Sequence, residues 1–187
     1  MRPIRSSRLR NRILLCVFLL FLSAPRAQVE PQETEVITLN LFFEETVGQV
    51  GQEISFPIKL FSSAPVQEPF QVILRFPPSK LEYVKLGMAD GPRDSGWKLT
   101  PELRKSPPAF DMHFLEILAE PGEGDFLPAG GDLAFAYFTI LEADTEHAIE
   151  LAPSIKQLGE APLEVETGPA EITALPEGTF ACFFYLH

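Results

Sequence analysis

The sequence predicts an all-β protein, an antiparallel β-sandwich of the jelly-roll type with about nine strands. In its clearest segments apolar and polar residues alternate with a period of two, which is typical of half-buried strands. Glycine and proline make up 28 of the 160 residues after residue 27, a density that leaves little room for long helices. Short apolar segments separated by turn residues recur along the chain, as they do in a sandwich.

The first 27 residues differ in composition from the rest and are predicted to be a secretory signal peptide. They hold six arginines and no acidic residue, together with the apolar segment Ile13–Ala24. Twelve residues rise only about 18 Å in a helix, which is less than the roughly 30 Å of a membrane core. We therefore expect cleavage after Ala27 and a secreted or periplasmic product without a membrane span. A mobile lead-in is expected over residues 28–35 and one domain over residues 36–187.

The charge of the chain after residue 27 excludes one class of partner. This part has nine basic and 26 acidic side chains, a formal charge of −17. Such a surface repels phosphate backbones, so we expect no binding of nucleic acid. Cys182 is the single cysteine in this part, and an internal disulfide is therefore ruled out. We expect it to be a buried thiol in the apolar strand Thr179–Leu186.

The first strands are predicted from alternation. Val36–Phe43 is the first expected strand, and Glu44–Gln52 is expected to be a turn. In Glu53–Phe61 every second residue is isoleucine, phenylalanine or leucine, which places these side chains on one face. Pro57 lies within this strand and cannot donate a hydrogen bond to a neighbouring strand. The strand is therefore expected at a sheet edge or beside a bulge.

The alternation recurs in Phe70–Phe76, where Gln71, Ile73 and Arg75 point outward. Connecting segments rich in glycine, proline and aspartate, such as Gly87–Gly96, are expected to be loops, and Pro101–Arg104 is compatible with a helical turn. Further strands are expected at Leu81–Leu86, Trp97–Thr100, Met112–Ala119, Leu133–Leu141, Ala148–Leu151, Leu163–Glu166, Glu171–Ala174 and Thr179–Leu186.

The segment Leu133–Ile140 is unusual because both of its faces are apolar. One face carries a leucine, Phe135 and Tyr137, and the other carries alanines, a phenylalanine and an isoleucine. A sandwich strand normally shows one polar face unless something covers it. Outward apolar residues here, together with Ile73, indicate a protein-binding patch, with a covering loop or a dimer contact as the alternatives. The periodicity leaves open which of the two faces points outward.

No catalytic arrangement is evident in the sequence. It contains no nucleophile-elbow, zinc-protease or phosphate-loop motif, and we expect no enzyme activity. A hydrolase would need His113 or His147 beside a buried carboxylate or a serine in a cleft. Asp111 and His113 share a strand face, where a solvated pair is favoured over metal ligation. Aspartates in the expected loops are interpreted as turn residues, with an oxygen-ligand calcium site as the less favoured alternative. No metal and no cofactor are expected.

Aromatic composition bears on sugar binding. Sugar-binding surfaces stack pyranose rings on exposed tryptophan or tyrosine, whereas this chain has one tryptophan, three tyrosines and 16 phenylalanines. Phenylalanine is typical of a protein core. Trp97 follows a glycine-containing loop, and core packing is its favoured interpretation. An exposed Trp97 would indicate the alternative function, a carbohydrate-binding module on the same architecture.

Four segments resemble, in order, the sequence of cohesin domains. In Val47–Leu60 a glycine precedes an alternating strand that has a proline between two apolar residues. Leu74–Val84 is similar to the next cohesin element, which runs from an aromatic–Asp–Pro step to a leucine and an apolar strand, although here the aspartate of the step is replaced by Pro77. Gly130–Leu141 resembles the later strand introduced by glycine, and Gly178–Tyr185 resembles the closing strand.

The resemblance implies a nine-stranded jelly-roll-like sandwich, close in architecture to cellulose-binding modules, that performs no chemistry. Cohesins bind dockerins, carried by the enzymes of polysaccharide-degrading complexes, through one sheet face. The resemblance therefore implies a dockerin-like protein partner and a connection with polysaccharide degradation. The residues that it implies for the contact face are Gln71, Ile73, Arg75, His113, Phe135 and Tyr137.

Overall fold

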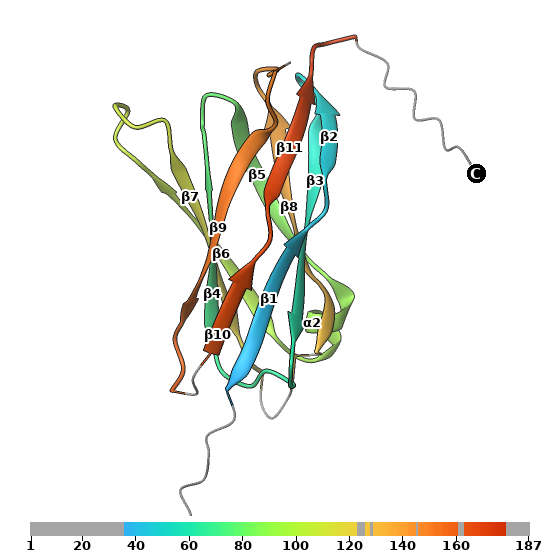
Figure 1. The fold of residues 1–187 in the computed structure, drawn as a ribbon, viewed down its shortest axis with the longest axis vertical. Coiled ribbons are helices and arrows are strands. Elements are labelled where there is room, and N and C mark those ends of the chain that lie inside the picture. The colour runs from blue at the N-terminus through green and yellow to red at the C-terminus, as the bar shows by residue number, and fades with distance from the viewer. Residues whose placement is uncertain (1–35, 123–125, 128, 145, 161–162, 179–187) are drawn as a thin grey trace, which may run out of the picture. The chain divides into compact units, whose positions relative to one another are not determined.

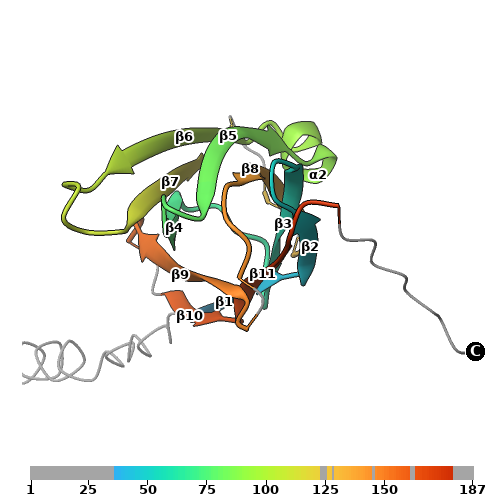
Figure 2. The same cartoon turned by 90° about the horizontal axis from the view of Figure 1, so that it is seen from above.

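The computed structural model describes residues 36–122, 126–127, 129–144, 146–160 and 163–178, and these form a β-sandwich of two curled sheets (Figures 1 and 2). The predicted all-β class is confirmed. The described part contains eleven strands and one short helix: β1 Ile37–Phe43, β2 Thr46–Gln49, β3 Glu53–Ser62, β4 Phe70–Phe76, β5 Leu81–Met88, α2 Asp90–Asp94, β6 Lys98–Lys105, β7 His113–Glu120, β8 Gly130–Ile140, β9 Ile149–Gln157, β10 Leu163–Thr167 and β11 Ala170–Leu175.

The described strands number eleven rather than about nine, and two short crossings between the sheets organise them. One sheet has the order β10-β1-β3-β8-β5, and the other has the order β2-β11-β9-β4-β7-β6. Only Glu44 and Glu45 separate β1 from β2, and only Gly168 and Pro169 separate β10 from β11, yet each pair crosses from one sheet to the other. Each crossing divides one long segment into two strands. The pairs β1–β10 and β2–β11 are parallel and join an otherwise antiparallel sandwich.

Phenylalanine fills the space between the sheets, as the composition predicts. Phe56, Phe70, Phe76 and Phe138 are among the largest fully buried side chains. The Phe138 ring is central, because its centroid lies 5.1 Å from that of Phe76, 6.5 Å from that of Phe56 and 6.0 Å from that of Tyr83. These edge-to-face contacts connect strands of both sheets, so the Phe138 ring holds the two layers together.

The alternation in β3 and β4 is confirmed by their burial, and Pro57 has a clear place. β3 is the middle strand of its sheet, which excludes an edge, but its pairing with β8 shifts register between Ile58 and Lys59. Pro57 therefore lies next to a bulge, the second of the two predicted situations.

Three local predictions are wrong. The expected turn Glu44–Gln52 contains β2, which forms because the chain pairs in parallel with β11. Pro101–Arg104 belongs to β6 rather than to a helical turn, and Pro101 is tolerated there because β6 is an edge strand. The expected loop Gly87–Gly96 contains α2, whose Pro92 lies in the first turn, where no backbone donor is needed. Residues 1–27, residues 28–35, Thr179–Leu186 and Cys182 lie outside the described residues.

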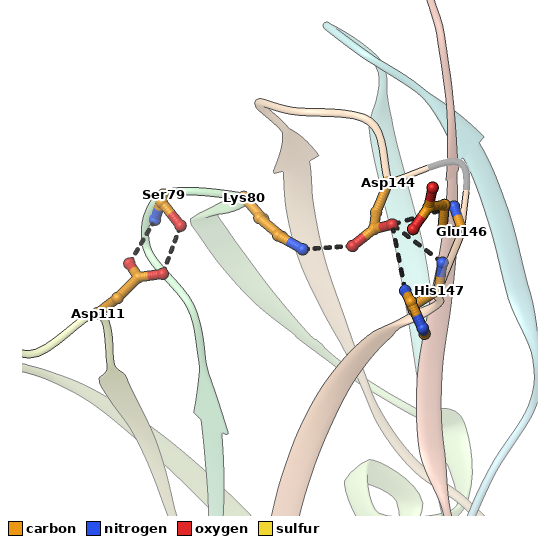
Figure 3. A network of polar contacts seen from close by, with 6 residues as sticks. All are labelled: Ser79, Lys80, Asp111, Asp144, Glu146 and His147. Atoms are coloured by element: carbon orange, nitrogen blue, oxygen red, sulfur yellow. Dashed lines mark hydrogen bonds and ion pairs between the residues drawn. The ribbon is translucent and has the colours of Figure 1, made fainter.

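A polar network connects three loops at one end of the sandwich (Figure 3). The Lys80 ammonium donates to Asp144 Oδ2 at 2.6 Å, and Asp144 Oδ1 accepts the backbone N–H groups of His147 and Glu146 at 2.9 and 3.1 Å. Asp111 accepts the backbone N–H of Ser79 at 3.0 Å and the Ser79 hydroxyl. The hydrogen bond from Lys80, followed by those from His147 and Glu146, lowers the pKa of Asp144 to about 2.

This network predicts an acid-sensitive contribution to stability. The pKa of Asp144 is lower in the folded state than its ordinary value of 3.8. The stabilisation is therefore complete above a pH of about 4 and is lost as the pH falls towards about 2. We expect Asp144→Asn to lower the free energy of unfolding at neutral pH and to converge with the parent protein in this acid range. Urea unfolding at a series of pH values measures it, with exposed Glu171→Gln as the control. A difference that stays constant down to pH 2 would contradict the assignment.

Candidate functional site

The outward surface of β4 and β7 is the first candidate site. Gln71, Ile73 and Arg75 of β4 point outward, as predicted, and they are half-buried. The register of β4 with β7 places Leu118 opposite Gln71, Glu116 opposite Ile73 and Phe114 opposite Arg75. We call the outward side chains of these two strands the β4–β7 face, which comprises Gln71, Ile73, Arg75, Phe114, Glu116 and Leu118.

Glu116 is the unusual residue of this face, because it points outward and yet is only 8% exposed. Its Oε2 accepts a hydrogen bond from Gln71 Nε2 at 2.8 Å and forms an ion pair with Arg104 Nη2 at 3.1 Å. Arg104 Nε also lies 3.3 Å from Glu102 Oε1 on the same strand. The charge of Glu116 is thereby held in a fixed position among the apolar side chains of Ile73, Phe114 and Leu118.

Removal of the arginine partner should cost stability. Arg104→Ala leaves the nearly buried Glu116 carboxylate with Gln71 as its remaining donor. Because the Arg104 side chain is 60% exposed, we expect a loss of only about 1 kcal/mol in the free energy of unfolding. Chemical denaturation measures the loss. Lys98→Ala is the matched control, since Lys98 is an exposed residue on the same face of β6 and forms no ion pair within the described residues. Equal effects of the two substitutions would contradict the role of Arg104.

Arg75 has a different environment. It is half-buried between Phe114 on β7 and Ala152 on β9, and it forms no ion pair in the part of the chain that the structure describes. In a chain with a formal charge of −17 after residue 27, a basic side chain that forms no ion pair with another described residue is conspicuous. The guanidinium can therefore receive a carboxylate or carbonyl oxygen from outside the molecule.

Phe135 and Tyr137 lie on the other sheet, so the structure does not bring them together with the β4 residues. Their strand β8 turns Ala134, Ala136 and Phe138 inward, which settles the phase that the periodicity left open. Phe135 and Tyr137 therefore point away from the core, on the opposite surface of the sandwich from the β4–β7 face. Lys85 Nζ lies 4.6 Å from the centroid of the Tyr137 ring.

The outward surface of this second sheet holds further aromatic residues. Phe42 on β1 and Phe61 on β3 are 49% and 43% exposed, and their ring centroids lie 5.4 Å apart in an edge-to-face contact. Pro57 of β3 lies opposite Phe135. We call this surface the aromatic face, which comprises Phe42, Pro57, Phe61, Phe135 and Tyr137.

His113 does not join either surface. Residues of β7 with the same parity, such as Leu115 and Ile117, are buried, and the His113 ring lies 5.9 Å from the centroid of Phe76. It lines a pocket of about 340 Å³ between β5 and β6, whose carboxylate belongs to the exposed Glu82. The expected contribution of His113 to an outward contact surface is therefore wrong, because β7 begins at this residue with its side chain turned towards the space between the sheets.

Trp97 is buried in the core. It is 2% exposed, and its ring lies 6.0 Å from that of Phe70. Core packing, the favoured interpretation of Trp97, is confirmed. The alternative, in which an exposed Trp97 would indicate a carbohydrate-binding module, is wrong. Trp97 directly precedes the edge strand β6, and its ring folds inward over Phe70 instead of lying on the surface.

Neither of the two pockets formed by described residues brings a histidine together with a buried carboxylate or a serine. A second pocket of about 340 Å³ lies between α2 and the start of β8, and its lining includes the carboxylates of Asp90 and Asp132. Both carboxylates are paired, Asp90 with Arg93 at 2.8 Å and Asp132 with Lys59 at 3.9 Å. In the described ranges no three histidine, cysteine or acidic side chains gather as metal ligands would. The same ranges contain no helix that is long and apolar enough to cross a membrane.

Sequence reasoning missed several members of both surfaces. Phe114, Glu116 and Leu118 lie in a segment that was recognised as a strand, but its two faces are both rich in apolar residues. Alternation therefore could not assign them to the outside. Phe42 lies next to another phenylalanine at the end of β1, and the outward position of Phe61 becomes apparent only after the β1–β3 pairing is known.

Comparison with solved structures identifies the fold. The seventh type I cohesin of ScaB from Pseudobacteroides cellulosolvens is 15% identical, with 79% of this chain and 98% of that chain covered and a TM-score of 0.57. The third cohesin of ScaC from Acetivibrio cellulolyticus, in complex with the ScaB dockerin, is 12% identical, with coverage of 75% and 99% and a TM-score of 0.54. The OlpC cohesin of Clostridium thermocellum, in complex with Doc435, is 10% identical, with coverage of 79% and 99% and a TM-score of 0.54.

These similarities show that the chain has a cohesin-like fold, and the fold implied by the four sequence segments is confirmed. At 10–15% identity they show the fold alone. No protein-family model matches the chain, and no curated protein matches it.

Proposed function

We propose that this chain is a non-catalytic, cohesin-like module that binds a protein partner through the β4–β7 face. The observation that carries the proposal is the composition of this face, in which Ile73, Phe114 and Leu118 surround a fixed, nearly buried Glu116 carboxylate. A small apolar centre with a few precisely held polar groups is typical of protein-binding surfaces.

The chemistry of the partner follows from the same residues. Arg75 offers a guanidinium that forms no ion pair with the described residues, so the partner segment supplies an oxygen acceptor beside Phe114. Apolar side chains of the partner cover Ile73 and Leu118. Two of the similar solved structures are cohesins in complex with dockerins, which supports a dockerin-like protein as the partner.

The cellular setting is part of the proposal. The basic, apolar start of the sequence supports export to the periplasm or the medium, and the resemblance of the four sequence segments to cohesins supports a role beside enzymes that degrade polysaccharides. A sugar site is not proposed, because Trp97 is buried and the aromatic face consists chiefly of phenylalanine, which has no polar edge.

The experiment is capture of a partner by the immobilised protein from the exported proteins of the source organism, followed by identification of the captured protein. The parent protein and Ser55→Asp, which is exposed on the opposite sheet, should both capture the same partner. Ile73→Asp should lose it. Capture that is equal on all three proteins, or absent from all three, would contradict the proposal.

A further inference from the structure

The strand order leaves one side of the sandwich open. β5 and β6 are edge strands of the two sheets, and in Figure 2 they lie on the same side of the molecule. The pocket of about 340 Å³ that His113 lines is located between them. We call it the β5–β6 pocket, and its lining includes Leu81, Glu82, Tyr83, Leu103, Lys105 and His113. None of its lining residues belongs to the β4–β7 face, so the function proposed above makes no use of it.

The inner part of the pocket is apolar, and core contacts fix its shape. Leu81 is fully buried. The Tyr83 ring packs edge-on against Phe138, with the centroids 6.0 Å apart. The His113 ring packs in the same way against Phe76, with the centroids 5.9 Å apart. The two rings that line the pocket are therefore held in place before any ligand arrives, as is usual in small-molecule sites.

A hydrogen bond beside the pocket joins its two sides. Asp111 Oδ1 accepts the backbone N–H of Ser79 at 3.0 Å (Figure 3). Ser79 directly follows Pro78, which lines the pocket from the turn between β4 and β5, and Asp111 lies two residues before His113. The turn that contributes Pro78 is thus tied to the segment that leads into β7. This tie keeps the pocket from closing or spreading between the two sheets.

Three polar groups that line the pocket are hydrogen-bond donors with no acceptor of their own. Lys105 lies opposite His113 in the β6–β7 register, so both side chains leave the same face of the sheet. Within the described ranges, Lys105, His113 and Tyr83 form no hydrogen bond or ion pair. Burial raises the pKa of Tyr83, so its hydroxyl keeps its proton. An ammonium, an imidazole N–H and a hydroxyl are therefore available to a ligand.

A carboxylate attached to an aromatic ring matches these features. Carboxylate oxygens accept several hydrogen bonds, and an ammonium donor strengthens them. A ring can pack against Leu103 and the rings of Tyr83 and His113. The volume is near the lower end of the roughly 300–1,000 Å³ that is typical of small-molecule sites. Glu82, an exposed residue of the lining, disfavours a second negative charge on the ligand. We propose that the β5–β6 pocket binds a small aromatic monocarboxylate, with its carboxylate at Lys105.

The experiment titrates the full-length, isotope-labelled protein with 3-phenylpropionate and follows the backbone amide chemical shifts. We expect saturable shifts at Tyr83, Leu103 and Lys105, with a dissociation constant of about 1 mM or below. Three related probes test the chemistry. 3-Phenylpropionamide lacks the charge and propionate lacks the ring, and each should bind at least about fivefold more weakly. Benzylmalonate carries a second carboxylate on the same skeleton and should also bind more weakly.

Variants of the lining then locate the site. Lys105→Gln should weaken binding of 3-phenylpropionate about fivefold or more, and Tyr83→Phe, which keeps the ring, about threefold. Lys98→Gln is the matched control and should bind as the parent does, because Lys98 is an exposed residue of the same strand outside the pocket. The spectrum of each variant reports whether it is folded.

The proposal is overturned if the shifts at the lining residues do not saturate up to about 10 mM probe. Equal affinity of the carboxylate and the amide, or parent-like affinity of folded Lys105→Gln, would also overturn it. These titrations contain no protein partner, and partner capture contains no probe. The ligand site and the proposed function of the β4–β7 face can therefore fail separately.

Discussion

Phe138→Ala is expected to be the most damaging single substitution for the fold. Its ring is fully buried and contacts the rings of Phe56, Phe76 and Tyr83 from both sheets. Truncation of a buried phenylalanine to alanine costs about 3–5 kcal/mol, because apolar contacts are lost and a cavity remains. This is a large part of the roughly 5–15 kcal/mol that stabilises a typical domain. The free energy of unfolding in urea measures the loss.

The matched control is Phe110→Ala, since Phe110 is 64% exposed. It should change the free energy of unfolding by less than about 0.5 kcal/mol. With Cys182 the only cysteine after residue 27, the described sandwich has no disulfide to compensate for a damaged core. A small effect of Phe138→Ala, comparable with that of Phe110→Ala, would show that the two sheets are not held together by the phenylalanine cluster.

Ile73→Asp is expected to have the largest effect on partner binding. Ile73 lies at the centre of the β4–β7 face, opposite Glu116, so the new carboxylate would stand beside an existing one in a surface that loses its water on binding. Central interface residues contribute 2 kcal/mol or more, which corresponds to a loss of affinity of about 30-fold or greater. Isothermal titration with the captured partner measures the change.

Ser55→Asp adds the same charge on the outward side of β3 and should leave the affinity for the partner unchanged. Arg75→Gln should weaken binding less than Ile73→Asp, because it removes one hydrogen-bonded contact but adds no repulsion. An Ile73→Asp protein that remains folded and binds as tightly as the parent would exclude the β4–β7 face as the contact surface.

The strands were predictable where one face is apolar and the other is polar. Phe70–Phe76 shows this pattern at every position except Ile73, and its boundaries and its outward residues agree with the structure. Prediction was weaker where tertiary pairing decides the outcome. β2 exists because β11 lies beside it, and Pro101 is accepted in β6 because that strand is at an edge. Neither the neighbour of β2 nor the edge position of β6 is visible in the local sequence.

The candidate site was predictable only in part, for a related reason. Alternation places Gln71, Ile73 and Arg75 on the outside, but it does not say which strands of a sandwich are neighbours. The resemblance to cohesins implies Phe135 and Tyr137 for the same contact face as the β4 residues, although β8 belongs to the opposite sheet. Glu116 carries no sequence signal at all. Its burial depends on Gln71, 45 residues earlier in the chain, and on Arg104 of the adjacent strand.

The most direct test of the proposed function is hydroxyl-radical footprinting of the protein with and without its captured partner. Phenylalanine and leucine side chains are labelled where water reaches them, so the two outward surfaces are compared in one experiment. We expect binding to protect Phe114 and Leu118 and to leave the labelling of Phe42 and Phe61 unchanged. Protection of Phe42 and Phe61 with no change at Phe114 and Leu118 would contradict binding through the β4–β7 face.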